Sequence, residues 1–75
     1  MSGVEMTKEV LDWLIWVIEI VSENMCSGDK TMAYDLLKQN GIWDWYVENY
    51  EVTHSLGQEY LLEEVREIVA AGGVG

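Results

Sequence analysis

The chain has 75 residues, no proline and one cysteine, and 49% of its residues are hydrophobic. This composition predicts one small globular domain, and a single cysteine that cannot form an internal disulfide fits a cytoplasmic protein. Fourteen acidic residues against four basic ones give a formal net charge of −10. The basic residues are scattered, which argues against nucleic acid and anionic membrane surfaces as ligands, since both need clustered Lys and Arg. The acidity favours solubility or attraction to a basic partner protein.

The segment from Val10 to Met25 predicts one amphipathic helix with an unusually wide apolar face. At about 100° per residue, its apolar arc covers roughly 220°, about twice what an ordinary surface helix needs. Trp13 and Ile20 extend this arc on one side and Ile15 extends it on the other, whereas Trp16 falls among the acidic residues opposite. Such a face must be covered on more than one side, by the other helices or by a second copy of the chain. Its centre is expected to consist of Val10, Leu11, Leu14, Val17, Ile18, Val21 and Met25.

The start of this helix has two candidates, because Thr7 can act as N-cap and Ser2 with Glu5 spells a capping box. Asp12 and Glu19 interrupt the apolar run, which is therefore too short for a membrane span of about 20 residues. The acidic residues before the run and the missing cleavage site also argue against a signal peptide.

A second helix is predicted from about Lys30 to Gln39, with Ser27 or Asp29 as its N-cap. Asn40–Gly41 should end it, because glycine adopts the left-handed backbone conformation that ends many helices. The residues after Gly41 predict a short aromatic helix, and Trp45 points away from its apolar face. That apolar face consists of Trp43, Tyr46, Val47 and Tyr50.

The last third of the chain predicts a connector and a final helix. Residues 51–54 form either a turn or one more helical turn. Ser55 and Gln58 spell a capping box for a helix that runs to about Ala71. Gly57 lies at the edge of the apolar stripe of this helix, which predicts either a close approach to a neighbouring helix or a plain surface position. The opposite stripe is interpreted as a solvated acidic face rather than as a cation site; it consists of Glu59, Glu63 and Glu67.

Together these elements predict an all-α fold, a small bundle of three longer helices plus one short helix. The sequence shows no strand-like alternation and no internal repeat. We expect a single helical domain, residues 1–71, followed by a flexible C-terminal tail, residues 72–75.

The segment YDLLKQNGIWDWYVENYEVTHSLGQEYLLEEVREIV resembles a family of small uncharacterised bacterial helical proteins. The matching features are the helix end at Asn40–Gly41, the aromatic short helix, and His54 to Gly57 at the start of an acidic last helix. The resemblance implies no established activity and no catalytic residue. Genes of this family sometimes lie beside genes for toxin-like ADP-ribosyltransferases, so the resemblance implies a partner-binding or antitoxin-like role.

No motif in the sequence predicts a catalytic residue, a cofactor site or a metal site. His54 is the only histidine, so no histidine pair exists for a metal ion. A Cys26–His54 pair would need a third group to orient it before it could activate a thiolate, and the sequence offers none. The simplest interpretation is that His54 either caps a helix end or bonds the backbone of the connector.

The main functional prediction is a small acidic protein–protein interaction module, regulatory or antitoxin-like, which is not an enzyme and forms a homodimer. Large aromatic residues outside the core are enriched at protein interfaces, so the predicted interface residues are Trp16, Trp45, Trp13 and Ile20. The opposing interpretation is that the N-terminal segment or the connector of the same chain covers Trp16. The alternative function is a small ligand-binding protein or enzyme, with its site between helices or at the dimer seam. The candidate functional residues of that site are His54, Tyr50 and Tyr60.

Overall fold

The computed structural model describes residues 7–74 and folds this part of the chain into helices without strands. The all-α class is confirmed, with five helices rather than four. The additional helix is α4, a single turn in the connector that the sequence left open. The helices are α1 (Lys8–Met25), α2 (Lys30–Gln39), α3 (Ile42–Glu48), α4 (Tyr50–Thr53) and α5 (Gln58–Ala70).

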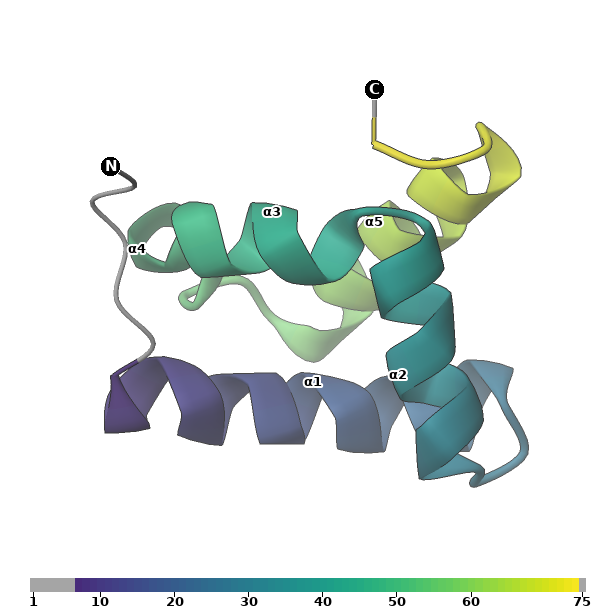
Figure 1. Cartoon of the computed structure of the whole chain (residues 1–75), viewed down its shortest axis with the longest axis horizontal. Helices are drawn as coiled ribbons and strands as arrows, with labels where there is room; N and C mark the ends of the chain where they lie inside the picture. The colour runs from purple at the N-terminus through teal and green to yellow at the C-terminus, as the bar shows by residue number, and fades with distance from the viewer. Residues whose placement is uncertain (1–6, 75) are drawn as a thin grey trace.

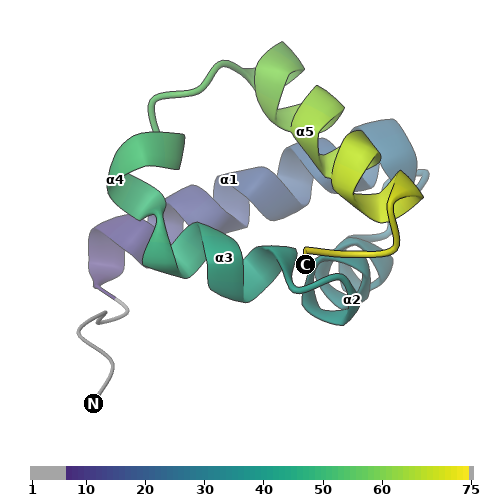
Figure 2. The same ribbon diagram turned by 90° about the horizontal axis from the view of Figure 1, so that it is seen from above.

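The longest helix, α1, runs along one side of the molecule, and α3 and α4 run back along the opposite side (Figure 1). Helix α2 rises from the end of α1 to the start of α3, at a steep angle to both. Helix α5 packs on α1 and, seen from above, lies over its C-terminal half (Figure 2). The three longer helices therefore do not run parallel to one another.

Helix α1 begins where its capping residue predicts. The side chain of Thr7 accepts a hydrogen bond from the backbone N–H of Val10, at 3.2 Å, which satisfies a donor that the helix itself leaves free. The competing capping box of Ser2 and Glu5 lies outside the described residues. Thr7 is therefore confirmed as the N-cap.

The core lies where α1 meets the other helices. Leu14, Val17 and Val21 recur at spacings of three and four residues, so they share one side of α1. All three are fully buried. Their partners in the same core cluster come from α2, α3 and α5, and the fully buried ones are Ala33, Leu37, Ile42, Tyr46, Leu61 and Val65.

Val10, Leu14, Val17 and Val21 of the predicted centre of the apolar face are buried, but the covered face of α1 is rotated towards the side of Trp13 and Ile20. Leu11 was expected at that centre, but it is 43% exposed, and Ile15 is 47% exposed. The side that carries Trp13, Trp16 and Ile20 is covered instead. The wide apolar arc is thus only partly buried, and its uncovered edge faces outward.

Two of the predicted helix boundaries are confirmed at α2. Asp29, rather than Ser27, is the N-cap, because its side chain accepts a hydrogen bond from the N–H of Met32 at 3.0 Å. Helix α2 ends at Gln39, followed by Gly41 at φ +73°. That left-handed conformation is strained for residues with a Cβ atom, so glycine fits the junction between α2 and α3.

The capping box predicted for the last helix is wrong. Gly57 is the N-cap of α5 and supplies no side-chain acceptor, while the hydroxyl of Ser55 donates to the carbonyl oxygen of Val52 at 3.4 Å. The close approach considered for Gly57 is also wrong, because a Cβ atom built there would meet nothing within 4 Å. The helix start at α5 is therefore open and lacks a side-chain cap.

Replacing Gly57 with serine should raise the free energy of unfolding by about 0.5–1 kcal/mol. The residue has φ −71° and ψ 162°, which any residue adopts, and the new hydroxyl can accept a hydrogen bond from the first turn of α5. Urea denaturation of both chains measures the difference. Gly57→Ala is the control, because it restricts the unfolded chain without adding an acceptor, and an equal gain from alanine would contradict the capping explanation.

The C-terminal end of α5 closes with a Schellman motif. Gly72, at φ +91°, donates its N–H to the carbonyl oxygen of Val69 at 3.1 Å, and Gly73 donates to Ile68 at 2.9 Å. The N–H of Val74 then donates to the carbonyl oxygen of Asn40 at 2.8 Å. The tail thus returns to the end of α2, although its predicted flexibility stays a prediction.

Candidate functional site

The tryptophans predicted to lie outside the core are half-buried against it. Trp16 and Trp45 both pack on the core cluster, and the Trp45 ring lies 5.5 Å from that of Tyr46. Ile20, a third predicted interface residue, is almost fully buried. The surface left for a partner at these positions is therefore small. The opposing interpretation, in which the same chain covers Trp16, agrees with this burial.

Trp13, the fourth predicted interface residue, joins α1 to α3 and α4. Its ring centroid lies 5.3 Å from that of Tyr46 and 5.6 Å from that of Tyr50, in tilted and edge-to-face arrangements. Such aromatic pairs stabilise a fold beyond the area they bury, by about 0.5–1.5 kcal/mol. Its indole N–H is buried and has no hydrogen-bond partner among residues 7–74. Trp13 therefore acts mainly as a packing residue.

Tyr46 forms the polar link between α3 and α5. The side chain is fully buried, and its hydroxyl donates to a carboxylate oxygen of Glu64 at 2.9 Å. Burial raises the pKa of Tyr46 far above its ordinary value of 10.0, and the hydrogen bond to Glu64 and the negative charge of Glu64 raise it further. The helical periodicity predicts Tyr46 on a core face, but it gives no sign of the carboxylate of Glu64, which lies 18 residues away in the sequence.

The free energy of unfolding should fall as pH rises above about 10, because of Tyr46. The folded chain keeps the phenol proton, whereas the unfolded chain releases it near its ordinary pKa of 10.0. The stabilisation is therefore complete below that pH and is lost above it, by up to about 1.4 kcal/mol per pH unit. Urea denaturation from about pH 9 to about pH 11 tests this slope.

Two variants separate this effect from general alkaline unfolding. Tyr46→Phe removes the titrating group and should flatten the slope, while Tyr60→Phe changes an exposed phenol and should leave it unchanged. An undiminished slope in Tyr46→Phe would assign the alkaline sensitivity to another group.

His54 caps the end of α4, which is the first of the two predicted alternatives, and its ring bonds the backbone of that helix. Its Nδ1 lies 2.7 Å from the carbonyl oxygen of Tyr50, so this nitrogen must carry a proton and donate it. The two rings are also stacked, with centroids 4.4 Å apart. The third candidate of the alternative site, Tyr60, is 63% exposed on α5 and lines a small hollow of about 130 Å³ with Glu63, Glu64 and Glu67. His54 does not line that hollow.

Cys26 is buried at the end of α1. Burial raises the pKa of the Cys26 thiol above its ordinary value of 9.0, and the negative charge of Asp29 raises it further. A reactive cysteine needs the opposite shift, because the thiolate is the nucleophile. The thiol therefore behaves as a small apolar group in the core.

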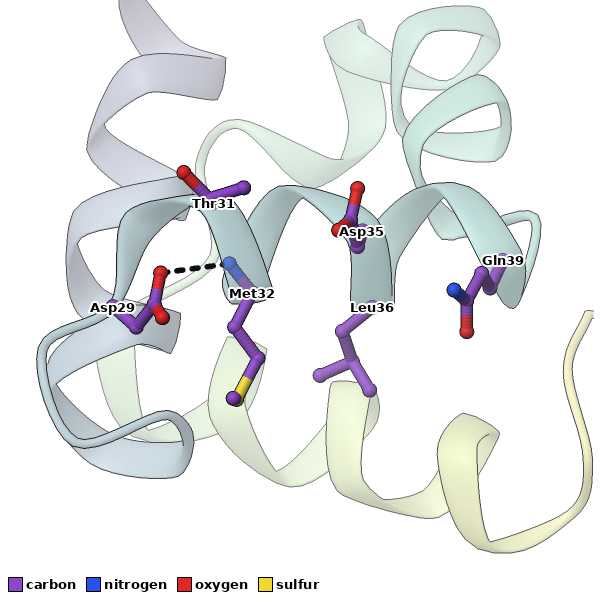
Figure 3. Close-up of a pocket in the computed structure, with 6 residues that line it drawn as sticks. All are labelled: Asp29, Thr31, Met32, Asp35, Leu36 and Gln39. Carbon is purple, nitrogen blue, oxygen red and sulfur yellow. Dashed lines mark hydrogen bonds between the residues drawn. The ribbon is translucent and has the colours of Figure 1, made fainter.

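A first shallow groove, here called the α2 groove, runs along one side of α2 and encloses about 380 Å³. Met32 and Leu36 point from α2 in the same direction and form its apolar part, while Asp35 and Thr31 point away from them (Figure 3). The carboxylate of Asp29 is engaged in capping the helix. The six lining residues are Asp29, Thr31, Met32, Asp35, Leu36 and Gln39.

A second groove, here called the α1–α2 groove, lies between the two helices and encloses about 370 Å³. Its apolar residues are Ile15 and Ile18 on α1 and Tyr34 on α2, with Tyr34 40% exposed. The Tyr34 ring is held edge-to-face against Trp43, with centroids 5.0 Å apart. Polar lining comes from Glu19, Lys30 and Thr31. Leu11 lies one helical turn before Ile15 and prolongs the apolar surface.

The α1–α2 groove was not predicted from the sequence as a binding site. The helical wheel puts Ile15 at an edge of the apolar arc, away from the expected interface residues. The sequence feature that could have indicated it is the width of the apolar arc of α1, because this arc is wider than one neighbouring helix can cover. The exposed apolar surface of α1 thus consists of Leu11 and Ile15 rather than of Trp16.

Two further properties of the described part concern membranes and metals. Between residues 7 and 74, no helix has the length and hydropathy of a membrane span. In the same range, no three His, Cys, Asp or Glu side chains are grouped as ligands for a metal ion.

Comparison with known proteins gives one match. No curated protein and no solved structure matches the chain significantly. The family model described as "Protein of unknown function (DUF3791)" matches residues 12–71, which include α2 to α5 and most of α1. The chain therefore belongs to the DUF3791 family of proteins of unknown function.

Proposed function

We propose that the chain is a small acidic, non-catalytic module that binds another protein in the cytoplasm through the α1–α2 groove. The observation that carries this proposal is the exposed apolar surface formed by Leu11, Ile15 and Tyr34 beside that groove. The rest of the apolar arc of α1 is buried or half-buried against its own chain. Fully burying an aliphatic side chain contributes about 1.5–3 kcal/mol, so a partner that covers these residues gains a substantial part of its binding energy there.

The geometry of the groove supports binding to protein rather than to a small molecule. Small-molecule sites are concave and bury most of their ligand, whereas this surface runs along a helix and into a shallow groove. Aromatic residues such as Tyr34 are enriched in protein interfaces. The surface is also surrounded by a strongly acidic chain, with a net charge of −10, which favours encounter with a basic protein.

A homodimer would use the same surface and would therefore compete with a partner protein for it. Trp16, predicted at its seam, is half-buried against the core of its own chain. A second copy would therefore meet Leu11 and Ile15 first, because they are the exposed apolar residues of α1. Sedimentation at micromolar concentrations, with Ile15→Ser as the disrupted variant, measures whether copies associate through this surface.

The protein-binding proposal is tested by affinity capture from a native cell extract with three baits. The wild type and Val52→Ser should retain the same partner, and Ile15→Ser should lose it. Val52 is the matched control, because it is also an aliphatic residue on a helix and is 72% exposed. Capture of the same proteins by all three baits would contradict a contact at the α1–α2 groove.

The family resemblance implies a regulatory or antitoxin-like setting for this module. That role requires that the captured protein have an activity which the chain changes. The measurement is the activity of the purified partner with wild-type chain, with Ile15→Ser and with no addition. Inhibition by the wild type alone would support the antitoxin-like role.

A further inference from the structure

The apolar residues of α1 beside the α1–α2 groove form a row whose spacing suits packing against another helix. Leu11, Ile15 and Ile18 occupy positions i, i+4 and i+7, so they lie on one side of α1. The row is about 10 Å long at 1.5 Å per residue. Tyr34 forms the opposite wall, on α2. Helices pack by fitting rows of side chains at these spacings into grooves of the same kind.

The backbone of the groove also favours a helical occupant. The lining residues come from α1 and α2. Those inside the helices use their backbone N–H and C=O groups within the helix, and the exceptions are the N–H groups of Lys30 and Thr31 in the first turn of α2. An extended peptide gains affinity by pairing its backbone with an open strand edge, and the described part of the chain has no strand. A helix satisfies its own backbone and needs only side-chain contacts.

The charges beside the groove are unequal on its two sides. Asp12 and Glu19 lie on the solvent side of Ile15 along α1, and both are exposed. On the α2 side the lining residue with a charge is Lys30. A bound helix would therefore place cationic side chains along α1. The net charge of −10 over the whole chain adds long-range attraction for a cationic partner.

We propose that the α1–α2 groove binds an amphipathic helix of a partner protein, with aliphatic side chains at i, i+4 and i+7 and Lys or Arg beside them. The proposal rests on the protein-binding function proposed above and names the class of partner. The cationic row faces Asp12 and Glu19. A second copy of the chain fits less well, because each copy carries a net charge of −10 and brings the same two acids to the contact.

The test uses a fluorescein-labelled synthetic helix of about 18 residues, with leucine at i, i+4 and i+7 and lysine in the flanking row. Fluorescence anisotropy measures the dissociation constant. We expect it to rise about tenfold in Ile15→Ser and to stay within about twofold of the wild-type value in Val52→Ser. Circular dichroism verifies that both variants are folded. An analogue with glutamate in place of each lysine should bind at least about tenfold more weakly than the lysine peptide.

The charge contact has its own matched pair of variants. Glu19→Gln should weaken binding of the lysine peptide about threefold, more than Glu67→Gln, which removes an equal charge from α5. Raising the salt concentration should reduce the difference between these two variants.

Several outcomes would overturn the proposal. One is equal binding of the lysine and glutamate peptides, and another is binding that Ile15→Ser does not change. A third is a wild-type chain that binds neither peptide but dimerises in sedimentation and dissociates in Ile15→Ser, which would identify a second copy as the occupant. If neither peptide binds while affinity capture still depends on Ile15, the protein-binding function survives and only the basic helix is excluded.

Discussion

Replacing Tyr46 with alanine should destabilise the chain by about 3–5 kcal/mol, in the range of large aromatic truncations in protein cores. Tyr46 is fully buried and packs against the rings of Trp13 and Trp45. Its truncation leaves a cavity between α1 and α3 and also removes the hydrogen bond to Glu64. Native domains have a free energy of unfolding of only about 5–15 kcal/mol, so the variant should lose a large share of its stability. Urea denaturation followed by far-ultraviolet circular dichroism measures this loss.

The matched variant Tyr46→Phe separates packing from hydrogen bonding. It keeps the ring and removes only the hydroxyl, so it should cost about 1–2 kcal/mol. Urea denaturation measures this variant, which stays folded. Tyr60→Ala truncates the same residue type at an exposed position and should cost less than about 1 kcal/mol. A Tyr60→Ala variant as unstable as Tyr46→Ala would contradict the burial of Tyr46 as the cause.

Replacing Leu14 with alanine should cost about 2–5 kcal/mol, whereas Leu11→Ala should cost less than about 1 kcal/mol. The two leucines lie one turn apart on α1, and the helical wheel places both on the apolar face. In the structure, Leu14 is fully buried and Leu11 is 43% exposed. Only Leu14→Ala therefore leaves a cavity in the core.

Urea denaturation of the two leucine variants gives both costs directly. Both substitutions remove the same atoms from the same helix, so helix propensity affects them equally. Equal losses of stability would mean that Leu11 is covered in solution, for instance by a second copy of the chain. In that case, the stability of the wild type would also increase with protein concentration.

The amino-acid sequence by itself determined the helical class and most helix boundaries. Thr7 and Asp29 act as N-caps and Gly41 ends α2, because capping is decided by hydrogen bonds between neighbours in the chain. At the start of α5, the capping box predicted from neighbouring residues does not form. There the hydroxyl of Ser55 has a choice of nearby partners and bonds the carbonyl oxygen of Val52 behind it.

His54 was predictable for the same local reason. Its partner, the carbonyl oxygen of Tyr50, is four residues away, which is the distance at which helical residues meet. The bond between Tyr46 and Glu64 was not predictable, because it joins residues on different helices. Periodicity fixes the face on which a residue lies but not which helix covers that face.

The tertiary structure alone decided which part of the wide apolar arc of α1 is buried. An arc of roughly 220° can be turned through many angles while still presenting an apolar face to the core. The positions of α2, α3 and α5 select the side with Trp13 and Ile20, and leave Leu11 and Ile15 exposed. The α1–α2 groove follows from that choice, since it exists only where α2 crosses α1 without covering Ile15.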